Sequence, residues 1–173
     1  MKKIILIIVL IHIYISGIAQ EADIENSPVE AKNAVYISYG GAGIFFSAIY
    51  ERHVIAGQGY NFGIKGGIGS SFSAALFPHE FSFPVGAFFL YGKGRHHLDV
   101  SMNVTSYLLE QYSYVEDKTN KELRLLYVPS VCYRFQKPEG GFTGRFGISP
   151  VININGVTNS FMPWVDVSLG WAF

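Results

Sequence analysis

The stretch FMPWVDVSLGWAF, residues 161–173, alternates between two kinds of side chain. Apolar side chains occupy the odd-numbered positions from Phe161 to Phe173, and acidic, hydroxyl or small ones occupy the even positions from Asp166 to Ala172. Successive side chains of a β-strand point to opposite faces, so this period of two predicts a strand with one apolar face. In a transmembrane β-barrel the apolar face lies against lipid and the other lines the interior. A soluble sandwich that uses the apolar face as its core fits the same periodicity.

The same alternation recurs along the chain from Val35 onward, in segments that turn residues separate. A bacterial barrel with both ends in the periplasm has an even number of strands, and these segments give seven. The candidate for the eighth strand is 33–40, which is followed by several glycines. If these glycines form a turn, the first strand is short. If they form a bulge, the first strand is long and residues 20–32 must thread or plug the lumen. We expect an all-β fold, a small antiparallel transmembrane barrel of about eight strands, with the seven clear strands at 43–54, 60–72, 80–91, 97–109, 122–136, 141–155 and 161–173.

The connections between these segments are of two kinds. Those at 56–59, 92–95 and 137–140 are short, whereas others, such as 114–121, are longer. Short periplasmic turns and longer outer loops are typical of outer-membrane barrels. This asymmetry favours the membrane barrel over the sandwich.

The first residues have the three parts of a secretory signal peptide: Lys2 and Lys3, an apolar run over 4–15, and small residues that end at Ala19. The run is shorter than the roughly 20 residues that a spanning helix needs, so we expect cleavage after Ala19. The chain then divides into a signal peptide at 1–19, an N-terminal periplasmic segment at 20–32 and an outer-membrane barrel at 33–173.

Composition excludes several classes of function. The net charge is zero, which argues against a nucleic-acid partner. Cys132 is the single cysteine and cannot form an internal disulfide. No metal-ligand spacing and no phosphate-binding loop is visible, and His53 fits a solvated turn residue better than a ligand. We therefore expect no cofactor-binding, metal or catalytic residues.

The C-terminus, Ser168-Leu169-Gly170-Trp171-Ala172-Phe173, resembles the signal that the outer-membrane barrel assembly machinery reads, with Trp171 and Phe173 as its aromatic positions and Ser168 where glycine is frequent. Motifs in the middle of the chain, FPVG at 83–86, LYGKG at 90–94, LDV at 98–100, YRFQ at 133–136, GGF at 140–142 and RFG at 145–147, resemble an uncharacterised family of small Bacteroidota outer-membrane barrels. The resemblance implies an outer-membrane location and a barrel, but no reaction.

The strand register places four acids and four bases on the inward face. A narrow barrel has room for side chains but not for a wide channel, so these charges should pair with one another and form a structural charge ladder. A gated path for ions or small solutes is the alternative. The set is Glu51, Lys65, Glu80, Asp99, Arg124, Arg134, Arg145 and Asp166.

Two further functions were weighed. His97, Asp99 and Ser101 suggest a lipid-modifying hydrolase, but residues so close on one strand seldom converge as a nucleophile and its base must, and we expect no enzyme. The polar loop at 112–121 should face outside, where it could contact an extracellular ligand, although a solvated loop that binds nothing is the favoured explanation. The remaining partners expected are the outer-membrane lipid and, during biogenesis, the barrel assembly machinery. The sequence thus favours a structural or interaction barrel, ahead of a narrow channel and a lipid-modifying enzyme.

Overall fold

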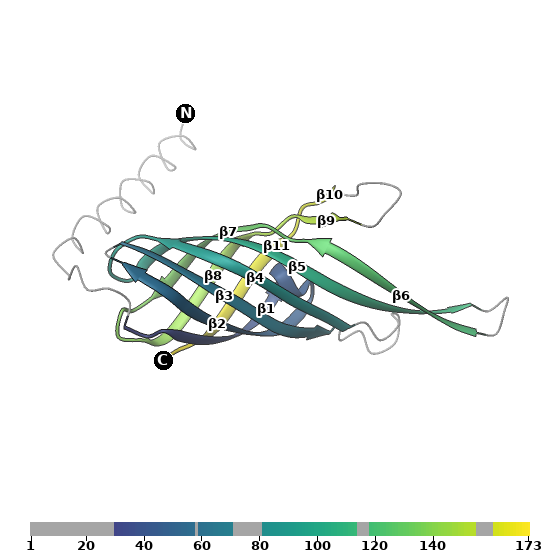
Figure 1. Ribbon diagram of the computed structural model, residues 1–173, viewed down its shortest axis with the longest axis horizontal. Coiled ribbons are helices and arrows are strands. Elements are labelled where there is room, and N and C mark those ends of the chain that lie inside the picture. Colours follow the sequence, from purple (N-terminus) through teal and green to yellow (C-terminus); the bar gives the residue numbers. More distant parts are fainter. Residues whose placement is uncertain (1–29, 58, 71–80, 114–117, 155–160) are drawn as a thin grey trace, which may run out of the picture.

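The fold is known from a computed structural model that describes residues 30–57, 59–70, 81–113, 118–154 and 161–173, with the backbone alone over 109–113 and 118–122. The expected signal peptide, its cleavage site and most of the expected periplasmic segment lie outside these residues. The described chain is all-β, and its strands form one closed antiparallel barrel (Figure 1). This confirms the predicted fold class.

Eight strands make the barrel wall, and three of them are interrupted. The pairing of β1 with β11 and of β5 with β7 closes the sheet on itself. The interrupted strands are β6 with β7, β8 with β9, and β10 with β11. The elements are β1 Asn33–Gly40, the 3-10 turn η1 Gly41–Gly43, β2 Phe46–Gly57, β3 Tyr60–Ser70, β4 Phe81–Tyr91, β5 His96–Ser113, β6 Lys118–Tyr127, β7 Ser130–Gln136, β8 Gly141–Ile148, β9 Val151–Asn153, β10 Phe161–Met162 and β11 Val165–Ala172.

The three interruptions each contain a proline: Pro129, Pro150 and Pro163. Proline has no N–H to donate to a strand ladder, and at these three positions the regular strand ends. The prediction of three unbroken strands at 122–136, 141–155 and 161–173 was wrong at these positions. Beyond the breaks β6 pairs with β9, and β9 pairs with β10.

The glycines after β1 form a turn that folds into the barrel. Tyr39 pairs with Phe46 across this turn, so β1 and β2 are a hairpin and the bulge alternative is wrong. The second strand begins at Phe46 rather than 43, because Gly43 belongs to η1. Gly41, Ala42, Gly43 and Ile44 are all buried. We call residues 41–45 the inner turn.

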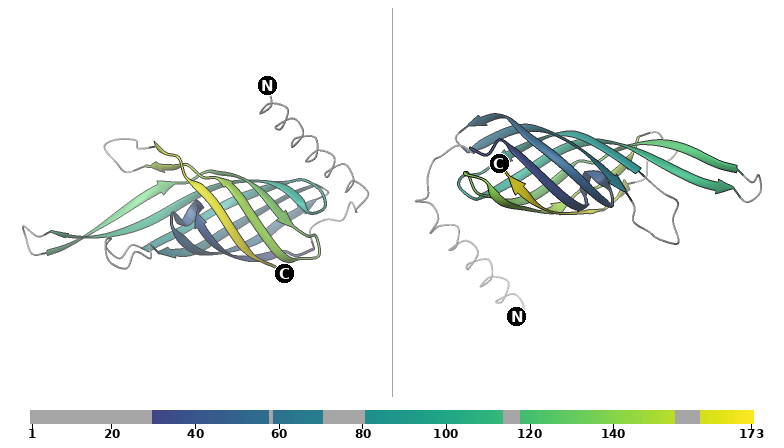
Figure 2. Two further views of the ribbon diagram at one scale, coloured as in Figure 1. Left: turned by 180° about the vertical axis from the view of Figure 1, so that it is seen from behind. Right: turned by 90° about the horizontal axis from the view of Figure 1, so that it is seen from below.

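The two ends of the barrel differ. The short connections β2 to β3, β4 to β5 and β7 to β8 share an end with the chain termini of the barrel, where Asn33 and Phe173 exchange two backbone hydrogen bonds. At the other end β5 and β6 run on as a ribbon that projects past the rest of the barrel (Figures 1 and 2). Ser113 pairs with Lys118, so most of the predicted loop at 112–121 is strand, and its tip, 114–117, lies outside the described residues.

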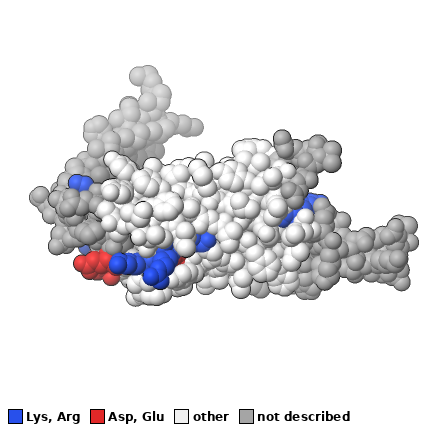
Figure 3. Space-filling view, viewed as in Figure 1, with Lys and Arg blue, Asp and Glu red and all other residues white. Residues whose placement is uncertain are grey.

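The faces of the wall are the reverse of those in a soluble protein. Among the described residues, 34 large hydrophobic side chains are exposed, and buried polar or charged residues outnumber buried hydrophobic ones by 20 to 14. The apolar faces therefore point outward and are not a sandwich core. On the face in Figure 3 the described charged side chains lie mostly toward the ends, with a broad uncharged band between them. Among the described residues no helix has the length and apolar character to cross a membrane.

Candidate functional site

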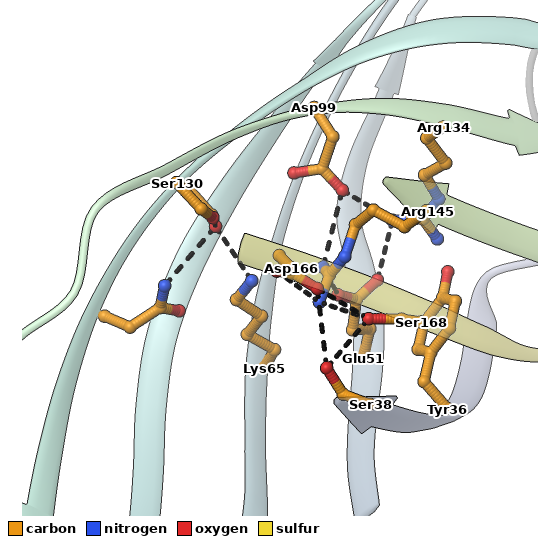
Figure 4. Close-up of polar contacts among 12 residues, drawn as sticks. Tyr36, Ser38, Glu51, Lys65, Asp99, Ser130, Arg134, Arg145, Asp166 and Ser168 are labelled. Atoms are coloured by element: carbon orange, nitrogen blue, oxygen red, sulfur yellow. Dashed lines mark hydrogen bonds and ion pairs between the residues drawn. The ribbon is translucent and has the colours of Figure 1, made fainter. Parts of the chain in front are cut away.

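The interior of the barrel holds a cluster of six charged side chains. Each stands on an inward position of a different strand: Glu51 on β2, Lys65 on β3, Asp99 on β5, Arg134 on β7, Arg145 on β8 and Asp166 on β11 (Figure 4). All six are buried, and the cluster contains three acids and three bases. We call these six residues the lumen cluster. A buried charge is costly unless a partner compensates it, so the pairing inside the cluster decides whether the lumen is stable.

Arg134 is the most completely satisfied member. Its Nη1 lies 2.7 Å from Oε2 of Glu51 and 3.3 Å from Oδ2 of Asp99. Its Nε and Nη2 both donate to Oε1 of Gln136, at 2.9 and 2.6 Å. The guanidinium also lies over the rings of Tyr36 and Phe88, 5.2 and 5.5 Å from their centroids, where cation–π attraction adds to the ion pairs.

Arg145 joins all three acids. Its Nη1 lies 3.0 Å from Oε1 of Glu51 and 3.6 Å from Oδ2 of Asp99, and its Nη2 lies 3.3 Å from Oδ2 of Asp166. Because Arg134 shares Glu51 and Asp99 with it, the two arginines and three carboxylates form one connected network across five strands. A change at any one member therefore leaves the others with incomplete pairing.

Hydroxyl groups complete the surroundings of Asp166. Its Oδ1 accepts from Ser168 at 2.7 Å and from Ser38 at 3.4 Å, and its Oδ2 accepts from Ser149 at 3.5 Å. The hydroxyl oxygens of Ser168 and Ser38 lie 2.9 Å apart. These small side chains stabilise the carboxylate and still fit a narrow lumen.

Lys65 lies at another side of the cluster, where its ammonium donates to the Ser101 hydroxyl at 2.8 Å. Ser101 also shares a short hydrogen bond with Ser130. Asn103 donates to the carbonyl of Val128 at 2.7 Å, which holds this polar patch beneath the proline break between β6 and β7.

The residues weighed as a hydrolase triad all point inward from β5, but they contact different groups. His97 Nε2 lies 3.3 Å from the carbonyl of Gln136, Asp99 pairs with the arginines, and Ser101 contacts Lys65. Ser101 is 1% exposed, and all three side chains line the lumen.

Of the eight residues of the predicted ladder, six form the lumen cluster. Glu80 lies outside the described residues. Arg124 is half-buried on β6, in register with Tyr107 near the projecting ribbon. The aromatic positions Trp171 and Phe173, expected to be read during assembly, point outward and are each 58% exposed.

Sequence reasoning missed several inward polar residues. His53 was expected to be solvated, but it is buried on β2 with its ring edge-on to Phe88, 5.1 Å between centroids. His53 is two residues from Glu51 on the same strand, so the alternation of side chains places both on the inward face. Gln136 carries no charge and was not among the predicted inward residues, whereas the alternation already placed Ser149 and Ser168 on the inward face. Among the described residues no group of three or more His, Cys, Asp or Glu side chains is arranged so that it could hold a metal ion.

The inner turn covers one side of the cluster. Thr105 donates to the carbonyl of Ala42 at 2.6 Å, Ser82 to that of Gly43 at 2.8 Å, and Trp164 to that of Ile44 at 2.6 Å. A Cβ added at Gly41 would lie 2.5 Å from Oδ2 of Asp166, so the turn rests directly against the cluster.

An apolar group of side chains fills the space around Ile44. The buried residues Tyr107, Leu126, Val128 and Val151 pack with it, and Trp164 stands edge-on to Phe45 with 5.9 Å between ring centroids. In the described residues the lumen thus holds an apolar layer around the inner turn and a charged layer beside it. A second buried apolar group lies nearer the chain termini and consists of Ala31, Ala34, Tyr36, Ile49 and Ala172.

No protein-family profile matches this chain, and none of the curated proteins does either. Among solved structures, the chain is similar to the outer membrane protein Ail of Yersinia pestis, determined in a phospholipid bilayer nanodisc. The similarity has a TM-score of 0.46 and a sequence identity of 9%, and it covers 83% of this chain and 100% of the other. The closed eight-stranded barrel is established by the strand pairing of this chain itself.

Proposed function

We propose that this protein is an integral barrel of the bacterial outer membrane, with a structural or interaction role and a lumen closed to solutes. The observation that carries the proposal is the inverted wall, with large hydrophobic side chains outside and paired charges inside. Exposed apolar surface costs about 25 cal/mol per Å² in water. That cost disappears when the same surface faces hydrocarbon, and a closed barrel leaves no unpaired sheet edge within the bilayer.

The orientation follows from the connections. The end with the three short turns and the barrel termini would face the periplasm, and the end with the inner turn and the projecting ribbon would face outside. The expected signal peptide and the resemblance to small Bacteroidota barrels belong to this proposal, as does assembly through the signal that ends on Trp171 and Phe173.

Fractionation and heat-modifiability test the location. We expect the protein in the outer-membrane fraction of the producing cells, with a band that migrates differently on a gel before and after boiling in mild detergent. Recovery as a soluble periplasmic protein without a mobility shift would overturn the proposal, because the exposed apolar band would then need another cover.

Absence of catalysis is a separate part of the proposal, supported by the burial of Ser101. Replacing Ser101 by alanine should leave the lipid profile of the host unchanged. An altered acylation pattern in the Ser101→Ala strain, restored by the native gene, would contradict this and revive the lipid-modifying enzyme.

An interaction role is favoured by the projecting β5–β6 ribbon. Within the described residues, β6 pairs only with β5 over 118–123, so its other edge offers backbone groups to an added strand there. We propose that an extracellular ligand contacts the ribbon at 112–121. Cells that carry a version with 112–119 replaced by a short Gly-containing turn should lose surface binding of that ligand while retaining the heat-modifiable band; equal binding by both strains would contradict the assignment.

A further inference from the structure

The outer surface of the barrel carries an apolar groove over β1, β2, β3 and β4. Its volume is about 310 Å³, and it lies among Ile37, Phe46, Ala48, Ile68, Ser70 and Phe81, with Ser47 and Gly69 completing its lining. None of these eight residues is charged, so the groove belongs to the uncharged outer surface. It is separate from the lumen cluster, since the six side chains named first point away from the barrel interior, whereas Ser47 and Gly69 stand at inward positions beneath them.

The strand register explains the shape of this groove. Ile37, Ala48 and Ile68 are aligned across β1, β2 and β3, so a methyl group stands between two long branched side chains. Ile37 is 72% exposed and Ile68 is 63% exposed, so their side chains form the two walls of the groove, and the short side chain of Ala48 between them forms its floor. In the next row toward the inner turn, the small Ser70 is aligned between Phe46 and Phe81 and repeats the pattern.

We infer that this groove binds one acyl chain of a lipid in the outer leaflet of the membrane. The inference rests on the proposed function, because the groove is continuous with the apolar surface that would face the bilayer. The row of Phe46 lies beside the inner turn, at the end of the barrel that carries the projecting ribbon, and this places the groove in the outer half of the wall.

The size and chemistry of the lining favour a lipid chain over other occupants. Specific protein interfaces take about 20–30 residues from each side, far more than the eight that form this groove. A headgroup would require charged or multiple polar partners, and the lining supplies only two serines. Retention should therefore depend on the acyl chain and be indifferent to the headgroup.

The test is photo-cross-linking in lipid nanodiscs, with a phosphatidylethanolamine that carries a diazirine within its acyl chain. For the native protein we expect cross-links concentrated on the peptides that contain 46–48 and 68–70, above the level elsewhere on the apolar band. Ala48→Phe fills the floor and should reduce these cross-links severalfold. Ala87→Phe makes the same change on β4 outside the groove and should leave them unchanged.

A second variant and a second probe make the result decisive. Ile68→Ala removes a wall instead of filling the floor and should also weaken the cross-links at 46–48. A phosphatidylcholine with the same diazirine chain should label the same peptides equally. Uniform labelling of the band, or labelling that Ala48→Phe and Ile68→Ala leave unchanged, would overturn the inference, as would labelling that depends on the headgroup.

Two outcomes separate this inference from the function on which it rests. A dimer in the discs that Ala48→Phe abolishes would assign the groove to a second copy of the chain and overturn the lipid. Retention of the heat-modifiable outer-membrane band in that case would leave the proposed function intact. Failure of the native protein to enter discs or the outer membrane would instead remove the proposed function itself.

Discussion

At the residue scale, the lumen cluster links strands that are far apart in sequence. Each charged side chain reaches its partners only in one register, because a slip of one residue would turn it out toward the apolar surface. Arg145 illustrates this, since it contacts acids from β2, β5 and β11 at once. A buried network of this kind need not add much stability over an apolar filling, but it penalises every other register.

Removal of one arginine should therefore be costly. In Arg145→Met, Glu51 and Asp99 retain only Arg134 among their guanidinium partners, and Asp166 retains only hydroxyls. We expect a loss of about 3–5 kcal/mol in the free energy of unfolding, the range seen when one partner of a buried ion pair is deleted. Urea titration of the protein in detergent micelles, followed by Trp fluorescence, measures it. Arg52→Met, on the exposed face of β2, is the matched control and should change the midpoint little.

Neutralising Asp166, which lacks an ion-pair partner in Arg145→Met, should recover part of the lost free energy of unfolding. Asp166→Asn combined with Arg145→Met removes the unpaired charge while the amide oxygen still accepts from Ser168. We expect the double variant to be more stable than the sum of the two single changes predicts, by about 0.5–3 kcal/mol, as for other residues in direct contact. Strict additivity in the same urea titrations would show that Arg145 and Asp166 are not coupled.

At the element scale, the inner turn depends on backbone conformations that few residues adopt. Gly41 has a φ of +61°, and Ile44, a branched residue, has a φ of +75°. The three side-chain hydrogen bonds to successive carbonyls of Ala42, Gly43 and Ile44 hold the turn in this shape. Packing of Ile44 in the apolar layer offsets its strained backbone.

Gly41→Ala should disturb both layers of the lumen. The left-handed conformation costs a residue with a Cβ about 1–2 kcal/mol, and the new methyl group would collide with the Asp166 carboxylate. We expect a lower urea midpoint and faster hydrogen exchange at the amides of Gly43 and Ile44. Gly144→Ala, whose Cβ would meet its nearest atom at 3.6 Å, is the control. Unchanged exchange in Gly41→Ala would contradict the packing described for the turn.

At the scale of the whole molecule, the alternation of side chains allowed the barrel to be predicted, and the breaks in it were harder to see. The period of two in 161–173 gave the correct faces from Val165 to Phe173, since it is a local property of one strand. The inner turn depends on contacts between distant strands, such as Trp164 with Ile44, which no local pattern shows. The prolines at the breaks are visible in the sequence, but Pro84 lies inside β4 without ending it, so a proline alone does not locate a break. The network around Arg134 could be predicted in its members but not in its pairing, because the pairing depends on how far the sheet shifts as it closes.

The two layers of the lumen act in series, which leads to a prediction on conductance. The native protein should give no current steps in a planar bilayer. In a first variant Glu51 and Arg134 are both replaced by serine, which keeps the net charge but removes part of the cluster; the inner turn should still close the lumen. In a second variant Thr105→Val and Ser82→Ala remove two of the three side-chain hydrogen bonds that hold the inner turn, and the cluster should still close the lumen. Only the variant that combines all four changes should conduct. Each variant must keep its heat-modifiable band for the comparison to hold. Current steps from the native protein would instead favour the narrow channel, because they would require an open path through both layers.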